Sequence, residues 1–415
     1  MSIPLDRLYH FVESIAQDIF QDRVVIYRFY PHGSKNFTDL TPLQTMSWRE
    51  WTPAPHVYCN DQEPLDYEYY ETVDKNINIF RPVGNLQRTR SMYDQVIILH
   101  SEKRGVNVEK YSNAPFVPVY YWSHAVIALD WFRYAQHIEL SKKSSKIFLV
   151  YNRAWTGTRE YRLKFSDYLI QKDIHQHCLT WTTPAELGIH YSNYVFKNPK
   201  WKPTCILEDY FPESIADSNY SADFDLNDYN ATDIEIVLET LFDDDRIHLT
   251  EKSLRPIAVG QPFVIAGTHG SLEYLRNYGF KTFDAIWDET YDTILNPDDR
   301  LIAICQLMQD IADWDPVTKV NNMRQANTIA NFNRQHFFSK EFFNLIKKEL
   351  VDNLTTAFNK IINNNTFKRW LDVWDQNLND TKLIEFLMQK NPAAFPTLQD
   401  IQQIKILINH KLNSE

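Results

Sequence analysis

A compact group of polar residues stands out between residues 246 and 283, a stretch that holds four of the nine glycines in the chain. Thr250 is a predicted N-cap, and Glu251, Lys252 and Arg255 follow it in the first turns of a predicted helix. A helix N-terminus carries partial positive charge and free N–H groups, so it can bind a diphosphate. Lys252 and Arg255 would neutralise phosphate, and Glu251 would accept hydrogen bonds from ribose hydroxyls. An amphipathic helix with a solvated charged end is the alternative interpretation.

Three arginines form a second group, just after the apolar run of residues 146–151. Arg153 lies directly after this predicted strand, and Arg159 and Arg162 lie beyond Gly157 at the start of a predicted helix. Residues three apart share a helix face, and a strand, a glycine loop and a helix N-terminus make a suitable phosphate site. We therefore expect the three arginines to face phosphate. A solvated basic helix is the alternative.

Acidic and imidazole side chains in the first third of the chain are candidates for acid–base chemistry. Asp61 and Glu63 follow the short apolar run of residues 56–59, so two carboxylates lie just past the carboxyl end of a predicted strand. The alternative is an acidic turn closed by the next proline. His124 stands beside Trp122 at a predicted helix start, where it could bind an acceptor or act as a base. A buried structural histidine is the alternative.

The elements that must position these residues alternate between strand and helix along most of the chain. Such alternation favours parallel sheets with crossover helices, whose ligands bind beyond the carboxyl ends of the strands. The predicted strands are residues 23–30, 56–59, 95–100, 116–121, 146–151, 233–239, 263–266 and 280–283, and the predicted helices include residues 123–136, 250–260 and 271–279. From residue 297 onward the pattern is helical, whereas residues 208–232 are predicted to be a long surface loop.

The run Thr250-Glu251-Lys252, with its small-residue turn and following strand, resembles the nucleotide-sugar signature of GT-B glycosyltransferases. The nearest similarity is to the alpha-1,3-fucosyltransferase family. That resemblance implies that Glu63 corresponds to the glutamate proposed as general base in the family. It also implies a diphosphate-binding arginine after the first strand of the second domain, for which Arg153 and Arg159 are the first candidates. Gly267, at the end of the predicted strand, completes the expected donor site.

The fold that the resemblance implies is α/β and of the GT-B type, with two Rossmann-like domains facing across a cleft and a C-terminal helical extension. We expect an acceptor-binding domain in residues 1–140, a nucleotide-sugar-binding domain in residues 146–300 and a helical region in residues 301–415. The small polar residues 141–145 are a predicted linker between the two domains.

The expected reaction is inverting transfer of a sugar from a nucleotide diphosphate sugar to a hydroxyl. Glu63 would deprotonate the acceptor, with Asp61 and His124 as alternatives, while Lys252, Arg153 and Arg159 stabilise the leaving diphosphate. The Asp-x-Asp triplets lie outside these motifs, so we expect no metal, and no cofactor beyond the nucleotide sugar as co-substrate.

The acceptor is predicted less directly. The Asn-, Ile- and Lys-rich, glycine-poor composition is what an A/T-rich genome encodes, which is compatible with a phage. We favour hydroxymethylcytosine in double-stranded phage DNA as acceptor, with glucose or arabinose as the sugar and Lys142, Lys143 and Lys146 as phosphate contacts. A surface glycan acceptor, or a non-catalytic nucleotide-sugar or nucleic-acid binding protein of the same fold, are the alternatives.

Composition and charge argue against several other classes of protein. A net charge of −11 argues against indiscriminate coating of nucleic acid. No run approaches the ~20 apolar residues of a membrane span, and the first residues do not resemble a signal peptide. The four scattered cysteines have no metal-ligand spacing. We therefore expect a cytoplasmic protein that does not bind membranes, located in the host cytoplasm if it is phage-encoded.

Overall fold

A computed structural model describes residues 25–28, 56–59, 96–103, 119–186, 188–211 and 222–362, with isolated positions between residues 8 and 18. The chain divides into two compact units. The first comprises residues 1–101, 106–123 and 348–415, and the second comprises residues 102–105 and 124–347. Residues 124–140 and 301–347, which the sequence analysis assigns to the flanking regions, thus belong to the second unit.

The first unit contains a four-stranded sheet, β1-β2-β3-β4, in which every pairing is parallel. Its strands are β1 (Val25–Arg28), β2 (His56–Cys59), β3 (Val96–His100) and β4 (Val119–Tyr121). All four coincide with predicted strands, so the parallel α/β character of this region is confirmed. The end of helix α13 (Lys340–Ile362) belongs to the same unit, where Asn353 Nδ2 donates to the Tyr121 carbonyl at 2.7 Å.

The second unit is built on a second parallel sheet with the order β10-β9-β5-β6. Its strands are β5 (Phe148–Asn152), β6 (Cys178–Thr182), β9 (Ile234–Leu238) and β10 (Phe263–Ala266). In chain order the strands run 2-1-3-4 across the sheet, so the direction of winding reverses between β5 and β9. Every residue of β5, β9 and β10 is buried, as expected for strands covered on both faces.

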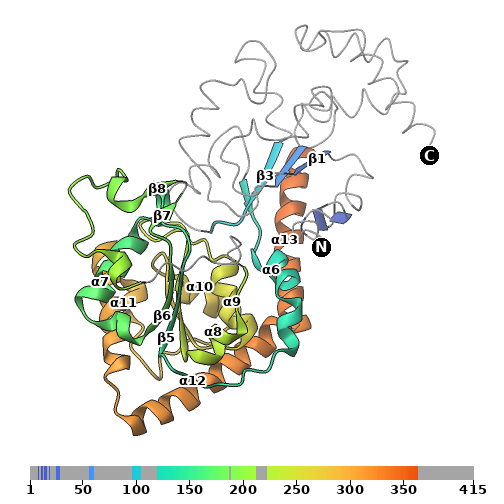
Figure 1. The fold of residues 1–415 in the computed structure, drawn as a ribbon. Helices are drawn as coiled ribbons and strands as arrows, with labels where there is room; N and C mark the ends of the chain where they lie inside the picture. Colours follow the sequence, from blue (N-terminus) through green and yellow to red (C-terminus); the bar gives the residue numbers. More distant parts are fainter. Residues whose placement is uncertain are drawn as a thin grey trace, which may run out of the picture. The chain divides into compact units, whose positions relative to one another are not determined.

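Helices cover both faces of this second sheet (Figure 1). Neighbouring residues of β5 show the two faces, because Asn152 Nδ2 donates to α7 at Ser166 Oγ (3.2 Å), whereas the Tyr151 hydroxyl donates to Asp228 of α8 (2.8 Å). Helix α9 lies on the α8 face against β9, and α12 packs on α9. The helices of this unit are α6 (Ala125–Trp131), α7 (Tyr161–Gln171), α8 (Leu226–Ala231), α9 (Glu251–Val259), α10 (Ser271–Asn277), α11 (Pro297–Ala312), α12 (Pro316–Phe337) and the start of α13.

Short elements connect these helices and strands. The 3-10 helices are η3 (Arg133–His137), η4 (Gly157–Arg159), η5 (Ile174–His177), η6 (Tyr191–Asn193), η7 (Leu207–Asp209) and η8 (Thr290–Thr293), and β7 (Ala185–Glu186) pairs with β8 (Ile189–His190) as an antiparallel hairpin.

Helix α9 begins and ends where the sequence predicts. Thr250 Oγ1 accepts from the Lys252 N–H as an N-cap, and Gly260 ends the helix with φ 83°. A side chain at Gly260 would be strained in this left-handed conformation, and its Cβ would lie 3.0 Å from Arg334 Cδ of α12. The glycine therefore lets α12 approach the end of α9 closely.

Two predicted elements are wrong. Residues 280–283 are not a strand: the Asn333 side chain of α12 accepts from the Lys281 N–H and donates to the Lys281 carbonyl, both at 2.8 Å. One amide thus satisfies both main-chain groups that a neighbouring strand would otherwise pair. The predicted loop of residues 208–232 contains helix α8, which Asp225 caps through the Asn227 N–H.

The predicted linker, residues 141–145, is bound within the second unit. Lys142 Nζ donates to the carbonyls of Tyr229 (2.7 Å) and Thr232 (2.6 Å) and to the Gln261 side chain. Lys146 Nζ donates to the Gln176 carbonyl at 2.5 Å. Both ammonium groups are engaged by protein acceptors in this structure, which removes support for their expected contacts with DNA phosphates.

Strand β10 forms one edge of the second sheet, and side chains occupy two main-chain groups that face outward along it. Pro262 and Ala266 direct their carbonyls to β9, so Ile265 and Gly267 face outward. The Ile265 N–H donates to the Tyr291 hydroxyl at 3.4 Å, and Arg300 Nε donates to the Gly267 carbonyl at 3.1 Å. Arg300, which is 1% exposed, also donates to the Phe242 carbonyl.

A buried carboxyl near this edge predicts a pH effect. Glu289 accepts from the Phe283 N–H at 2.7 Å, and burial raises the pKa of Glu289 from 4.5 to about 7. Between these two values the folded protein binds a proton that the unfolded chain has released, so the free energy of unfolding should fall as pH rises. Denaturant titrations near pH 5 and pH 7.5 should show this fall in the wild type relative to Glu289→Gln. A constant difference between the two proteins would contradict the assignment.

Candidate functional site

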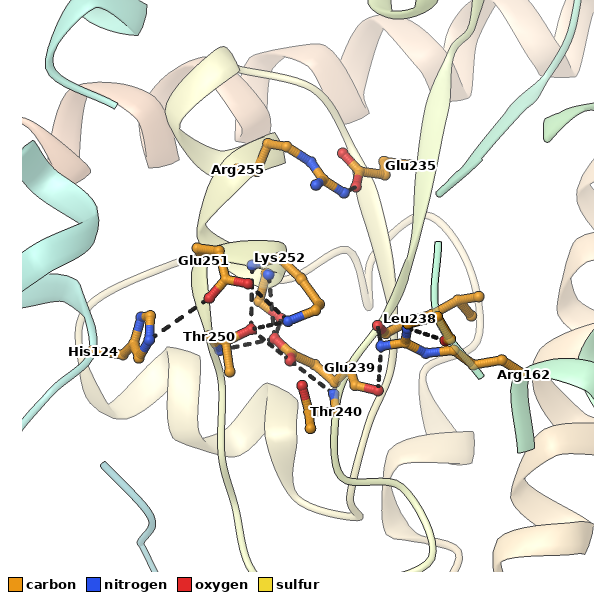
Figure 2. A network of polar contacts seen from close by, with 12 residues as sticks. His124, Arg162, Glu235, Leu238, Glu239, Thr240, Thr250, Glu251, Lys252 and Arg255 are labelled. Atoms are coloured by element: carbon orange, nitrogen blue, oxygen red, sulfur yellow. Dashed lines mark hydrogen bonds and ion pairs between the residues drawn. The ribbon is translucent and has the colours of Figure 1, made fainter. Parts of the chain in front are cut away.

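The reversal of winding between β5 and β9 places the carboxyl ends of these two strands side by side. Ligands of open parallel sheets bind in the crevice at such a switch point. Arg162 of α7 joins the two ends, because it donates to the Ala154 carbonyl (2.6 Å) after β5 and to the carbonyls of Leu238 (2.6 Å) and Glu239 (3.0 Å) at the end of β9 (Figure 2). Arg162 is 2% exposed, so it supports the site from within the protein and does not face phosphate as expected.

A fully buried carboxylate holds the start of α9 against the end of β9. Glu239 accepts from the Thr250 N–H (2.9 Å) and hydroxyl (2.9 Å) and from the Ser253 N–H (3.2 Å) and hydroxyl (2.7 Å). Two of the N–H groups at the start of α9 that the sequence analysis expects to be open to a diphosphate, those of Thr250 and Ser253, therefore already have a carboxylate partner.

Glu251 and Lys252 of α9 lie beside this anchor (Figure 2). Lys252 Nζ donates to Glu251 Oε1 at 2.7 Å and to Thr250 Oγ1 at 3.2 Å. Glu251 is 2% exposed, and its Oε2 lies 3.7 Å from Nε2 of His124, which the structure also buries. The ring of His248 stands edge-on to the ring of His124 with centroids 6.1 Å apart. The structure thus brings the predicted residues Glu251, Lys252 and His124 together.

The guanidinium groups of two arginines lie close to the ring of Tyr151. The guanidinium of Arg153 lies 4.6 Å from the ring centroid and that of Arg255 lies 4.5 Å from it. Burial lowers the pKa of Arg153, and the charge of Arg255 lowers it further. Arg255 itself is buried and forms an ion pair with Glu235 of β9, so it stands under the site and not at its surface.

Arg159, further along the same loop, lies near the charge of Arg162. Burial lowers the pKa of Arg162, and the neighbouring charge of Arg159 in η4 also lowers it. Arg153 and Arg159, in the loop after β5, thus each lie near the charge of another arginine.

Gly267 lies at the carboxyl end of β10, where the chain passes closely over α10. A Cβ at this position would stand 3.0 Å from Ser271 Oγ and 3.2 Å from Ile265 Cγ2. Asp61 and Glu63 lie outside the described residues, so their predicted roles stay predictions. Among the residues that the structure describes, no three His, Cys, Asp or Glu side chains form a group suited to a metal ion.

Comparisons of the chain with protein-family profiles, with curated proteins and with solved structures give no match. The site therefore has to be interpreted from its own chemistry. In the described part of the chain, no helix has the length and apolar character that crossing a bilayer requires.

Sequence reasoning missed two residues of this site, Glu239 and His248. Glu239 ends the run Asp233–Glu239, in which a carboxylate directly follows buried strand residues. A charge at that point of a parallel strand indicates either a ligand contact or an internal partner, and the pattern alone does not distinguish them. His248 lies two residues before the predicted N-cap and carries no spacing signal of its own.

Replacing Glu239 tests its role as anchor. Glu239→Gln keeps the size but directs an NH₂ group at N–H and hydroxyl donors, so the variant should lose about 2–3 kcal/mol of unfolding free energy. Urea titration measures this loss. Glu273→Gln, on the first turn of α10 and exposed, is the matched control and should change stability by less than about 0.5 kcal/mol. Equal stability of both variants would refute the anchor.

Proposed function

We propose that the chain is a glycosyltransferase that binds the diphosphate of a nucleotide sugar at the carboxyl ends of β5 and β9. The observation that supports this proposal is the position of Arg153 and Arg159 in the loop after β5 and of Lys252 at the start of α9, which Glu239 ties to the end of β9. Cationic side chains at this position suit a diphosphate, and the sequence resemblance of Thr250-Glu251-Lys252 supplies the reaction class.

The proposed chemistry is a direct displacement at the anomeric carbon. The acceptor hydroxyl gives its proton to Glu63, its oxygen forms a bond to the sugar, and the bond from the sugar to the diphosphate breaks. The diphosphate leaves with the electron pair, and the arginines and Lys252 stabilise its added charge. The GT-B arrangement, with two Rossmann-like domains facing across a cleft, is part of this proposal. The proposed mechanism is inverting and needs no metal.

Glu251 has a second proposed role at the same site. Its carboxylate is shared between Lys252 and His124, at 2.7 Å and 3.7 Å. A phosphate that attracts Lys252 would leave Glu251 to accept from a ribose hydroxyl, and His124 would keep the carboxylate oriented. This arrangement supports His124 as a residue that orients Glu251 more than as a base.

The proposed acceptor is hydroxymethylcytosine in phage DNA, with a surface glycan as the alternative. The lysines at 142 and 146 give no support to the DNA acceptor, because their ammonium groups have protein partners. The test is direct: the protein is incubated with nucleotide sugars and either hydroxymethylated duplex or glycans, and transfer is followed by mass spectrometry. Transfer to neither acceptor class from any donor would reject the proposed function.

Donor binding can be tested before the acceptor is known. Nucleoside diphosphates and their glucose, arabinose and other sugar conjugates should raise the melting temperature if they bind the folded protein alone. A matching donor should stabilise the protein in excess EDTA as well as without it, since the proposed site uses cationic side chains. Stabilisation that EDTA abolishes would reject the metal-independent form of the proposal.

Lys252→Ala should weaken the binding of the stabilising nucleoside diphosphate about tenfold to hundredfold, because it removes one charged hydrogen bond to phosphate. Isothermal titration calorimetry measures the change. Lys319→Ala is the control: Lys319 Nζ also pairs with a carboxylate, Asp233 at 3.3 Å, but Asp233 precedes the amino end of β9. Unchanged affinity in Lys252→Ala, or an equal loss in both variants, would contradict the donor site.

A further inference from the structure

The loop that carries Arg153 and Arg159 is held by a single carboxylate from the β7–β8 hairpin. Glu186 Oε2 accepts from the N–H groups of Trp155 (2.6 Å) and Thr156 (2.8 Å), and Glu186 Oε1 accepts from the Thr156 hydroxyl (2.9 Å). Three donors in two consecutive residues therefore converge on one side chain.

The same segment holds the loop a second time, through Tyr194 and Glu160. The Gly157 N–H donates to the Tyr194 hydroxyl at 3.1 Å. The same hydroxyl donates to Glu160 Oε1 at 3.2 Å. The Lys197 N–H donates back to both oxygens of Glu160, at 3.2 Å and 3.0 Å. Hydrogen bonds thus run in both directions between the loop and residues 186–197.

An aromatic contact fixes the middle of the loop. Trp155 is fully buried, and its Nε1 donates to the Thr183 carbonyl at 2.8 Å. Its ring meets the Tyr194 ring edge-on, with centroids 5.1 Å apart. Arg153 precedes Trp155 by two residues and Arg159 follows Gly157 by two, so the held residues lie between the two arginines.

We propose that Glu186 is a positioning residue for diphosphate binding, which keeps Arg153 and Arg159 at the carboxyl end of β5. This inference rests on the proposed function. A loop with free N–H groups would sample many conformations, and ordering it on binding would weaken affinity. Glu186 orders the loop before the ligand arrives, and it does so without touching the ligand itself.

The test uses three variants of the full chain and two measurements. Glu186→Gln directs an amide NH₂ at the loop donors, and Thr156→Val removes only the hydroxyl donor. Glu208→Gln is the matched control, because Glu208 of η7 also accepts hydrogen bonds from residues 186–197, but from His190 (2.6 Å) and the Tyr191 hydroxyl (2.8 Å). Amide hydrogen exchange reports the order of the loop, and calorimetry with inorganic pyrophosphate reports its ability to bind a diphosphate.

Glu186→Gln should speed exchange at Trp155 and Thr156 and raise the dissociation constant for pyrophosphate about tenfold, while exchange in α12 stays unchanged. Thr156→Val should change both quantities less and in the same direction, and Glu208→Gln should change neither. Unchanged exchange at the loop overturns the proposal. Faster exchange with unchanged pyrophosphate affinity also overturns it, since the role would then be structural only.

These outcomes separate the inference from the proposed function. A wild-type protein that binds pyrophosphate but no nucleotide sugar would reject the glycosyltransferase, while the response of Glu186→Gln would still decide the role of Glu186. A wild-type protein that binds no pyrophosphate overturns the inference.

Discussion

Arg255→Met should lower the free energy of unfolding by about 3–5 kcal/mol, the cost of leaving one charge of a buried pair without its partner. Arg255 is 3% exposed and Glu235 is fully buried. Burial would lower the pKa of Arg255, but the charge of Glu235 raises it above its usual range. Tyr229 completes the group, because its hydroxyl donates to Glu235 and accepts from Arg255 Nε at 3.2 Å. Urea unfolding of the variant measures the loss.

A double variant distinguishes charge from packing. Arg255→Met combined with Glu235→Leu removes both charges and keeps apolar volume, so it should recover much of the stability lost in Arg255→Met. A double variant that is less stable than Arg255→Met would show that the ion pair itself, and not the burial of a lone charge, governs the effect. The pair lies beneath Tyr151, so the single variant should also shift Arg153.

Glu63→Gln should reduce sugar transfer by about 10²–10⁴-fold, the range expected when a general base is removed. Glutamine keeps the size of the side chain but cannot accept the acceptor proton. The turnover number should fall while the dissociation constant of the donor nucleotide stays near the wild-type value, because the proposed donor site lies on other residues. A transfer assay with the matching donor, together with calorimetry, measures both quantities.

Asp61→Asn is the natural comparison, since it removes a second carboxylate from the same turn. It should leave turnover within about tenfold of the wild type if Glu63 is the base. The reverse result, with Asp61→Asn inactive and Glu63→Gln active, would move the role to Asp61. Full activity in both variants would remove the base from this turn.

Local patterns were sufficient for the elements whose partners lie close in the sequence. The apolar run Phe263–Ala266, bounded by Pro262 and Gly267, predicts β10, and Thr250 and Gly260 predict both ends of α9. These predictions succeed because caps, glycine turns and short buried strands depend on neighbouring residues. The four strands of the first sheet follow the same logic.

Local sequence patterns could not predict hydrogen bonds between residues that are distant in the sequence. The stretch Phe280–Phe283 has strand propensity, but the Asn333 side chain, 52 residues from Lys281, forms the two main-chain hydrogen bonds that a neighbouring strand would form. Arg162 shares a predicted face with Arg159, yet contacts with residues 76 and 77 positions away bury its guanidinium. Of the predicted residues, Glu251, Lys252 and His124 do lie together, whereas which residues face a ligand depends on tertiary burial.

The outer edge of β10 has a consequence for how copies of this protein meet in concentrated solution. An unprotected edge strand is a template on which another chain can add a strand, which is the first step of many aggregates. Here the Tyr291 hydroxyl and the Arg300 guanidinium occupy the outward N–H of Ile265 and carbonyl of Gly267. An incoming strand would have to displace a tyrosine and a buried arginine to pair with the Ile265 N–H and the Gly267 carbonyl. These two side chains thereby hinder edge-to-edge growth of the sheet on this side.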